Sequence, residues 1–283
     1  MDIKTITVIG AGIMGRGIAQ VSAMGGFTTY LVDPVEKALE TALSTIEKNL
    51  QKGVQLGKFD EQQAKESLQR INPTGDRAMA AGKADFVIEV APEDIEIKLE
   101  VFRGLDKECP KHTILATNTS AKSITEIAQA TSRPDKVIGM HFFNPVHIMK
   151  LVEIIRGLET SDETLETTMK VSEMMGKQTV EVNEFPGFVT SRISAMIGNE
   201  CFYMLQEGVA SAEDIDKAIV LGLNFPMGPL ALGDMNGIDS RLKVMEYLHE
   251  TLGEKYRPCP LMVKYVKAGR LGRKTGRGVF EYD

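Results

Sequence analysis

The sequence predicts an α/β fold, with an N-terminal Rossmann-type doubly wound sheet followed by an all-helical C-terminal domain. Over the first two thirds of the 283-residue chain, short apolar runs rich in β-branched residues alternate with helix-like segments, a pattern typical of a parallel sheet. Beyond residue 184 such runs nearly vanish, and apolar residues recur at helical spacing. We therefore expect two domains, residues 1–184 and residues 185–283.

The expected strands are short, and Gly, Asp, Asn or Pro bounds each of them. Because their runs are apolar without alternation, we expect them to be buried on both faces of the sheet. The expected strands cover residues 6–9, 29–32, 86–90, 113–116, 136–140 and 178–182. The helix-like segments between them include residues 35–52 and 60–68.

The C-terminal domain begins after a break at residues 183–188. Ile193, Met196, Ile197 and Met204 would form one apolar face of its first helix. This face exceeds what one helix can bury alone, so we expect a homodimer or a higher homo-oligomer, although the first domain could also cover it. Ser211, followed three residues later by an acidic residue, resembles the start of another helix.

Composition and charge exclude several classes of protein. With 25% charged and 43% hydrophobic residues, the chain is not a disordered tail. Its net charge of −6, without a basic stripe, is typical of a protein that does not bind nucleic acid. No segment has the pattern of a signal peptide or a membrane span. Cys109, Cys201 and Cys259 form no disulfide framework or metal motif, so we expect a cytoplasmic protein without a metal.

The strongest local motif is Gly10-Ala11-Gly12-Ile13-Met14-Gly15, which follows the first strand and opens a helix. In a dinucleotide-binding turn, these three glycines would allow the tight turn, the approach of a pyrophosphate and close packing of helix on strand. The helix N-terminus would supply N–H groups to the phosphates. Asp33 ends the next strand and would accept hydrogen bonds from a ribose, which favours NAD over NADP, although the nearby Lys37 softens this preference. The alternative is a turn that binds no ligand.

A second group of polar residues follows the later strands and includes the segments 118–120 and 141–145. Because ligands of open α/β sheets bind outside the carboxyl ends of the strands, both segments would face the nicotinamide end of the cofactor. His141 is suited to proton transfer near neutral pH, and Glu153 would orient its ring if the two side chains meet. The alternative is a structural histidine. We expect that structural role for His112, His147 and His249.

Taken together, these motifs resemble the 3-hydroxyacyl-CoA dehydrogenase family, and in particular its short bacterial members that act on 3-hydroxybutyryl-CoA. The resemblance extends over essentially the whole chain. It rests on the glycine motif, Asp33 and the segments Asn118-Thr119-Ser120, His141-Phe142-Phe143-Asn144-Pro145, Pro186-Gly187-Phe188 and Gly272-Arg273-Lys274-Thr275-Gly276-Arg277-Gly278. The resemblance implies reversible oxidation of a 3-hydroxyacyl-CoA with NAD as the cofactor, in butyrate or fatty-acid metabolism, by a protein that is typically dimeric.

The resemblance also implies roles for single residues. His141 matches the catalytic histidine, Glu153 its carboxylate partner, and Ser120 a serine that contacts both substrate and nicotinamide. Asn144 matches an asparagine at the nicotinamide ribose, near the substrate. The full set of expected cofactor contacts is Gly10, Ala11, Gly12, Ile13, Met14, Gly15, Asp33, Glu93, Lys98, Asn118, Ser120, Asn144 and Lys274. The lysines near the expected CoA phosphates are Lys48, Lys52 and Lys58, of which we select Lys52 as a substrate contact.

One position departs from the family pattern. The family often has an asparagine, which helps to hold the substrate, where this chain has Ser191. Serine is shorter and offers one donor, so a substrate contact could run through water or fail. The alternative is that Ser191 only caps the helix that it starts.

Two other functions compete with this reading. A dehydrogenase of the 3-hydroxyisobutyrate type would act on a free acid and use a lysine as its proton relay, and the chain has no matching glycine-rich lysine segment. A non-catalytic NAD-binding protein of the lambda-crystallin sort would not need Ser120, His141 and Glu153 together.

Overall fold

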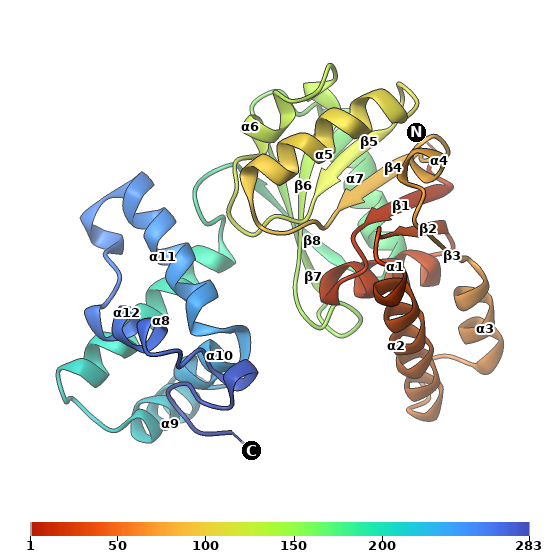
Figure 1. Ribbon diagram of the computed structural model, residues 1–283. Coiled ribbons are helices and arrows are strands. Elements are labelled where there is room, and N and C mark those ends of the chain that lie inside the picture. The colour runs from red at the N-terminus through yellow and green to blue at the C-terminus, as the bar shows by residue number, and fades with distance from the viewer. Residues whose placement is uncertain (1, 283) are drawn as a thin grey trace. The chain divides into compact units, whose positions relative to one another are not determined.

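The computed structural model describes residues 2–282 and contains two compact units, which divide between Glu184 and Phe185. We call them the sheet unit and the helical unit, and we describe each by itself. Figure 1 shows the strands and their helices in the red-to-green part of the chain and a cluster of helices in the teal-to-blue part. The predicted fold class is therefore confirmed.

The sheet unit is built on one eight-stranded sheet with the order β3-β2-β1-β4-β5-β6-β7-β8. Neighbouring strands are parallel except for β6 and β7, which are antiparallel. The strands are β1 (Thr5–Ile9), β2 (Thr28–Val32), β3 (Ile71–Thr74), β4 (Phe86–Glu89), β5 (Ile114–Thr117), β6 (Val137–Phe142), β7 (Leu151–Arg156) and β8 (Gln178–Asn183). The order reverses between β1 and β4, which is the position where doubly wound sheets bind their ligands.

Helices cover both faces of this sheet. On one face α4, α5 and α6 contact one another in sequence, and on the other α1 packs against α2 and α3 and meets α7 near Ser22 and Met175 (Figure 1). The helices are α1 (Ile13–Met24), α2 (Glu36–Gln55), α3 (Glu61–Gln69), α4 (Arg77–Ala81), α5 (Ile95–Glu108), α6 (Ile124–Ala128) and α7 (Asp162–Met174), with a 3₁₀ turn at Pro134–Lys136.

Burial on both faces explains the character of the central strands. Every residue of β4, β5 and β6 is buried. The polar side chains inside these strands therefore stand out, because burying a polar group is costly unless it is hydrogen-bonded. Glu89, Thr117 and His141 are the clearest cases.

Six of the eight strands were expected from the sequence, with ends that differ by a residue or two, and β3 and β7 were not. The edge strand β3 consists of Ile71-Asn72-Pro73-Thr74, and an edge position tolerates a proline that lacks an N–H donor. The strand β7 contains Glu153 in an otherwise apolar run, which obscured its strand pattern.

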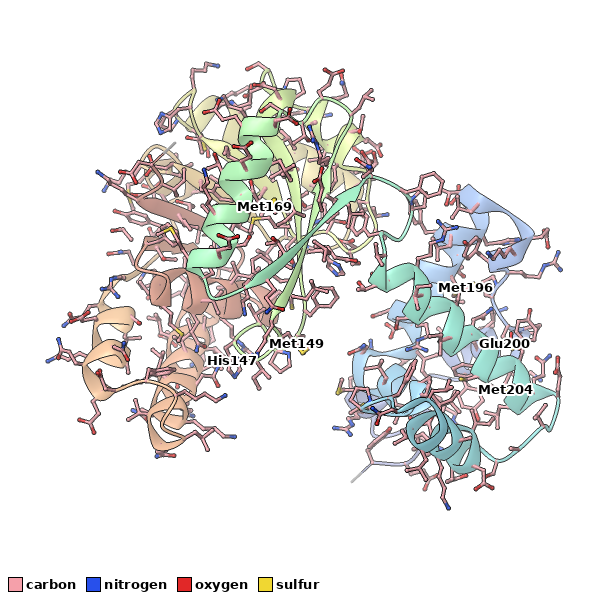
Figure 2. The ribbon with its side chains drawn as sticks, turned by 180° about the vertical axis from the view of Figure 1, so that it is seen from behind. His147, Met149, Met169, Met196, Glu200 and Met204 are labelled. Carbon is pink, nitrogen blue, oxygen red and sulfur yellow. The ribbon has the colours of Figure 1, made fainter. Side chains whose placement is uncertain are left out.

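The helical unit holds α8 (Thr190–Gln206), α9 (Ala212–Leu223), α10 (Pro229–Asn236), α11 (Ile238–Leu252) and α12 (Pro260–Lys267), with 3₁₀ turns at Glu254–Tyr256 and Arg273–Thr275. The expected helix start at Ser211 is confirmed, because its side chain accepts a hydrogen bond from the N–H of Asp214. Figure 2 shows Met196, Glu200 and Met204 along α8. Met196, Ile197 and Met204 pack within this unit, so of the apolar face only Ile193 stays largely exposed.

In residues 2–282, no helix is long and apolar enough to cross a bilayer. The same residues contain no group of three or more His, Cys, Asp or Glu side chains placed to hold a metal ion.

Candidate active site

The glycine motif forms a tight turn between β1 and α1. Gly10 has a φ of +107°, a conformation that L side chains rarely adopt, and its N–H donates to Val32 O at 2.7 Å. A Cβ at Gly15 would overlap Gly10 O, so the missing side chain is what lets α1 pack this closely on β1. A Cβ at Gly12 would have nothing within 4 Å. The turn therefore leaves open space at Gly12 for a ligand.

The start of α1 suits an anionic ligand. Gly12 occupies the N-cap position and has no side chain with which to satisfy the first N–H groups of the helix. Such N–H groups, together with the helix dipole, attract phosphate. Ile13 is 60% exposed beside them, while Ala11 and Met14 pack against the core. These residues fit the pyrophosphate of a dinucleotide.

Asp33 lies at the end of β2 beside this turn. Its Oδ2 accepts from the N–H of Ala11 at 2.8 Å, and its Oδ1 accepts from the N–H of Val35 at 2.9 Å. Each oxygen keeps a further lone pair that a ribose hydroxyl could use. Lys37 forms an ion pair with Glu40 at 3.0 Å and none with Asp33. The carboxylate thus fits the ribose of NAD, and its charge disfavours a 2′-phosphate.

His141 and Glu153 meet inside the sheet. They are directly opposite each other in the antiparallel register of β6 and β7, which places their side chains on the same face. Nδ1 of His141 lies 2.7 Å from Oε2 of Glu153, and the exposed fractions are 8% and 0%. The ring also packs against Phe143, with 4.6 Å between the ring centroids. A buried carboxylate at Nδ1 fixes the orientation of the ring and stabilises its charged form.

Asn118 joins the ends of β5 and β6. Its Oδ1 accepts from the N–H of Phe142 at 2.9 Å, next to His141. The side chain therefore helps to hold the segment that carries the histidine. Its carboxamide oxygen makes this internal contact, and the expected contact of Asn118 with the cofactor stays a prediction.

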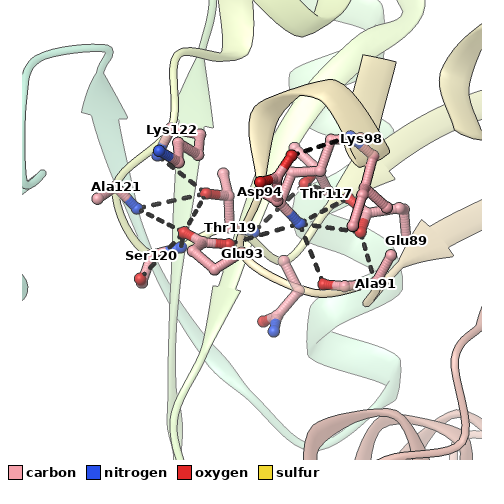
Figure 3. Close-up of polar contacts among 12 residues, drawn as sticks. Glu89, Ala91, Glu93, Asp94, Lys98, Thr117, Thr119, Ser120, Ala121 and Lys122 are labelled. Atoms are coloured by element: carbon pink, nitrogen blue, oxygen red, sulfur yellow. Dashed lines mark hydrogen bonds and ion pairs between the residues drawn. The ribbon is translucent and has the colours of Figure 1, made fainter. Parts of the chain in front are cut away.

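Ser120 is held by Glu93. Oε1 of Glu93 accepts from the N–H of Ser120 at 2.8 Å, from Oγ of Ser120 at 3.1 Å, and from Oγ of Thr119 at 2.6 Å (Figure 3). Burial raises the pKa of Glu93, but the charge of Lys98 and these hydrogen bonds outweigh burial and lower it overall. Glu93 thus fixes the position of Ser120, and its expected contact with the cofactor stays a prediction.

A second glutamate, which the sequence analysis did not single out, lies deeper in the sheet unit. Glu89 is 0% exposed in β4, and both of its carboxylate oxygens bind Nζ of Lys98, at 2.9 and 3.1 Å. Glu89 also accepts from Oγ of Thr117 at 2.6 Å and from the N–H of Ala91 at 2.6 Å (Figure 3). The signal that could have revealed it is an acidic residue inside an otherwise apolar strand.

This network changes the expectation for Lys98. Its side chain is 1% exposed, and Nζ binds the two Glu89 oxygens and Ala91 O, with Glu93 at 3.5 Å. An ammonium has three donors, so these partners use its hydrogen-bonding capacity. Lys98 thus orders the two glutamates around it, and its expected contact with the cofactor stays a prediction.

The loop after β6 carries Asn144 and His147, and the charges of Lys52 in α2 and of Lys58 just after α2 act on His147. Asn144 is exposed and precedes a cis proline peptide bond. Burial lowers the pKa of His147, and the charges of Lys58, Lys177 and Lys52 lower it further. Lys177 itself is tied to the loop, because its Nζ donates to Val146 O and Met149 O. Figure 2 labels His147 and Met149 in this loop.

Ser191 and Lys274 belong to the helical unit. The first helix of that unit starts at Thr190 with Val189 at the N-cap position, so Ser191 lies within the first turn and does not cap it. The alternative that Ser191 only caps this helix is therefore wrong. Nζ of Lys274 donates to both oxygens of Asp239, at 2.6 and 2.7 Å.

Comparison with known proteins gives one consistent result. Residues 5–185 match the sequence model of the 3-hydroxyacyl-CoA dehydrogenase NAD-binding domain, and residues 187–282 match that of the 3-hydroxyacyl-CoA dehydrogenase C-terminal domain. The chain is 51% identical to a probable 3-hydroxybutyryl-CoA dehydrogenase of Bacillus subtilis, covering 100% of this chain and 99% of the relative. It is 46% identical to a 3-hydroxybutyryl-CoA dehydrogenase of Clostridioides difficile, covering 98% and 99%.

A solved structure is similar over the whole chain. The (S)-3-hydroxybutyryl-CoA dehydrogenase of Ralstonia eutropha is 43% identical, with a TM-score of 0.96 and 100% of each chain covered. Together with the two matching domains, this similarity establishes that the chain belongs to the 3-hydroxyacyl-CoA dehydrogenase family of NAD-dependent oxidoreductases.

Proposed function

We propose that this protein catalyses the reversible NAD-dependent oxidation of (S)-3-hydroxybutyryl-CoA to acetoacetyl-CoA. The observation that carries the proposal is the buried contact between His141 and Glu153 at the carboxyl end of β6. Relatives that match this chain over its full length are named for the same activity. The role is in butyrate or fatty-acid metabolism.

His141 acts as the acid–base group of the reaction. In the oxidation, the ring takes the proton of the C3 hydroxyl as the C3 carbonyl forms, and Glu153 stabilises the resulting imidazolium. In the reduction, the imidazolium returns that proton to the oxygen at C3. What the cofactor supplies when bound is hydride acceptance from C3, or hydride donation in the reverse direction.

When the substrate is bound, the hydroxyl of Ser120 turns its one hydrogen from Glu93 to the oxygen at C3, where negative charge develops during the reduction. Donors aimed at developing charge make large contributions when their positions are fixed in advance. Glu93 holds the backbone N–H of Ser120 throughout, and the Glu89–Lys98 pair in turn orders Glu93. Asn144 and Ser191 are the further contacts that we assign to the ribose and to the substrate.

Coenzyme A binds at the positive region formed by Lys52 and Lys58. Both side chains are exposed, and their charges act on His147 in the loop that also carries Asn144. Lys48 lies one helical turn before Lys52 on the same helix. Lysines in this arrangement suit the phosphates of the CoA moiety.

The experiment follows the absorbance of NADH while three substrates are offered side by side: acetoacetyl-CoA, free acetoacetate and a longer 3-ketoacyl-CoA. We expect turnover of the CoA esters and little of the free acid, with NADH preferred over NADPH because of Asp33. Preference for free acetoacetate would identify a free-acid dehydrogenase. Tight NADH binding without turnover of any substrate would identify a non-catalytic protein.

We also infer a homodimer or higher homo-oligomer formed through the helical unit. Leu221 and Leu223, at the end of α9, are 74% and 62% exposed, and exposed large apolar side chains suit a protein contact. Sedimentation velocity should give a species of at least twice the chain mass, and Leu221→Lys should shift it toward the monomer. A monomer for the unaltered protein would contradict this inference.

The cytoplasm is the compartment that we infer. Cys109, Cys201 and Cys259 are buried and form no disulfide, which suits a reducing environment. Burial raises the pKa of Cys109 to about 12 and that of Cys201 to about 11, so both stay as thiols at neutral pH. Fractionation of the source cells, followed by immunodetection, tests the location.

A further inference from the structure

Lys177 is a buried lysine that has no part in the acid–base pair or in the glycine turn. It lies between α7 and β8, and it is 7% exposed. Burial alone lowers the pKa of its ammonium, and no carboxylate forms an ion pair with it among residues 2–282. Lysine is almost never buried without such a partner. The hydrogen bonds that Lys177 forms instead therefore indicate what it does.

The end of α7 fixes the backbone of Lys177. Gly176 has a φ of +72°, and the N–H of Lys177 donates to Ser172 O at 3.0 Å, as in the turn that commonly ends a helix. The N–H of the next residue, Gln178, donates to Lys150 O at 2.8 Å. These contacts place Lys177 beside the end of the loop that follows β6.

The loop after β6, residues 143–150, contains a turn that Lys177 holds. The N–H of Met149 donates to Pro145 O at 3.0 Å and closes this turn. The carbonyl oxygens of Val146 and Met149 accept from Nζ of Lys177, the second of them at 2.9 Å. One ammonium thus binds both carbonyls and fixes the shape of the turn.

The loop also packs on α1, through Val146. This side chain is 2% exposed, and a Cβ added at Gly17 of α1 would lie 2.8 Å from the Cβ of Val146. The contact is so close that a larger residue at Gly17 would have to shift the loop. The loop is therefore anchored both to Lys177 and to the helix whose start suits the pyrophosphate of the cofactor.

We propose that Lys177 is a positioning residue, which holds the loop so that Asn144 meets the nicotinamide ribose of NAD. Asn144 is exposed in the same loop, two residues before Val146. A loop that is ordered before binding avoids the entropy cost of ordering on binding, so its contacts add more to affinity. The contact of Asn144 with the ribose rests on the proposed function, whereas the contacts of Lys177 with the loop do not.

Titration with NADH, followed by its fluorescence, tests this role without turnover. Lys177→Met keeps the side-chain length but removes every donor, so the loop loses its fixed shape and the Kd of NADH should rise about tenfold. This variant should fold, because an apolar side chain replaces a buried charge and leaves no other charge unpaired. Lys170→Met changes an exposed lysine of α7 and is the matched control, with an unchanged Kd.

The kinetic constants give a second readout. Because a ribose contact is present in both the bound state and the transition state, Lys177→Met should raise the KM for NADH about tenfold and change kcat less than about threefold. His141 and Glu153 keep their places, because the pairing of β6 with β7 holds them. The double variant Lys177→Met/Asn144→Ala should bind NADH little more weakly than Asn144→Ala alone, since Lys177 acts through Asn144.

Gly17→Ala disturbs the same loop and retains Lys177. Its methyl group would displace Val146, while alanine favours the helix and so keeps α1 folded. The Kd of NADH should again rise. Gly222→Ala is the matched control, because a Cβ at that glycine of α9 would meet nothing within 4 Å.

Three results would overturn the proposal. The first is an unchanged Kd of NADH in Lys177→Met or in Gly17→Ala, whatever their melting temperatures. The second is a fall in kcat of Lys177→Met with an unchanged KM for NADH. The third is a loss of affinity in Lys177→Met that multiplies with that of Asn144→Ala. Weaker NADH binding by Lys177→Met, with no turnover of acetoacetyl-CoA by the unaltered protein, would support the role of Lys177 and contradict the proposed function.

Discussion

Two buried pairs in the sheet unit have similar components and different roles. Each joins a glutamate that is 0% exposed within a strand to a basic side chain, Glu153 to His141 and Glu89 to Lys98. The ammonium of Lys98 has its donors occupied by Glu89 and Ala91, so that pair can only hold its surroundings in place. An imidazole held at Nδ1 has a second nitrogen through which a proton can pass. Similar burial therefore suits a structural anchor in one place and the proposed acid–base group in the other.

The largest effect is expected for the histidine pair. His141→Ala should lower kcat by about 10²- to 10⁴-fold, with NADH binding retained in a fluorescence titration, because the acid–base group is lost. Glu153→Gln should also lower kcat, and the double variant should be little worse than the worse single one. His249→Ala, which breaks an exposed histidine–glutamate pair, is the control and should leave kcat unchanged. Multiplicative losses in the double variant would show that the two residues act independently.

Breaking the lysine pair should affect stability instead. Lys98→Met leaves the Glu89 carboxylate buried without its cation, which should lower the free energy of unfolding by about 3–5 kcal/mol in urea titrations. Lys37→Met breaks an exposed pair and should cost less than about 1 kcal/mol. If both variants lose equally little, the buried pair is not an anchor and the contrast with His141 fails.

Glu93 has both a structural and a positioning role, because Lys98 orders it and it positions Ser120. Glu93→Gln should lower kcat/KM by about tenfold, since one oxygen must then serve the donors of the serine loop without a charge. Glu96→Gln, on the exposed side of α5, is the matched control. Equal kcat/KM for Glu93→Gln and the unaltered enzyme would show that Glu93 does not position Ser120.

The same variant has a pH signature. The pKa of Glu93 is lowered from 4.5 in the folded protein, so its ionised form contributes stability above the ordinary value. That contribution is lost as the pH falls through the lowered pKa. The stability difference between the unaltered enzyme and Glu93→Gln should therefore shrink in acid, as measured by thermal unfolding from neutral to acidic pH.

The smallest effect is expected for Ser191, which belongs to neither pair. Because Ser191 does not cap α8, Ser191→Ala should not show the cost of about 1 kcal/mol that loss of a cap brings. If the hydroxyl reaches the substrate, kcat/KM should fall severalfold with the melting temperature unchanged. A fall in the melting temperature of Ser191→Ala by several degrees, with unchanged kcat/KM, would instead indicate a structural role for Ser191.

The fold was largely predictable from the sequence, because its central strands are continuous apolar runs and its glycine motif has a strand before it and a helix after it. The edge strand β3 was not, since Asn72 and Pro73 do not resemble a strand. Residue types also indicated His141 as the acid–base residue, because a histidine at the carboxyl end of a strand in this fold is suited to proton transfer.

The partnerships inside the site were not predictable in the same way. No pattern in the sequence indicates that β7 runs antiparallel to β6. This antiparallel pairing places Glu153 opposite His141. Similarly, the sequence did not indicate that Lys98 binds Glu89 or that Glu93 binds Ser120, because both contacts depend on side-chain geometry. Both strand-borne glutamates were visible as acids within apolar runs, a pattern that deserves weight in related chains.

The antiparallel register also decides where the chain can change in length. Side chains alternate between the two faces of a strand, so one residue inserted within β7 before Glu153 would turn its carboxylate to the opposite face. The loop between the two strands is under no such constraint at its exposed residue Ile148. Insertions there would leave the histidine and its carboxylate opposite each other. The twelve-residue separation in sequence is therefore incidental, and grafting or lengthening this loop is a route to altered substrate contacts that preserves the acid–base chemistry.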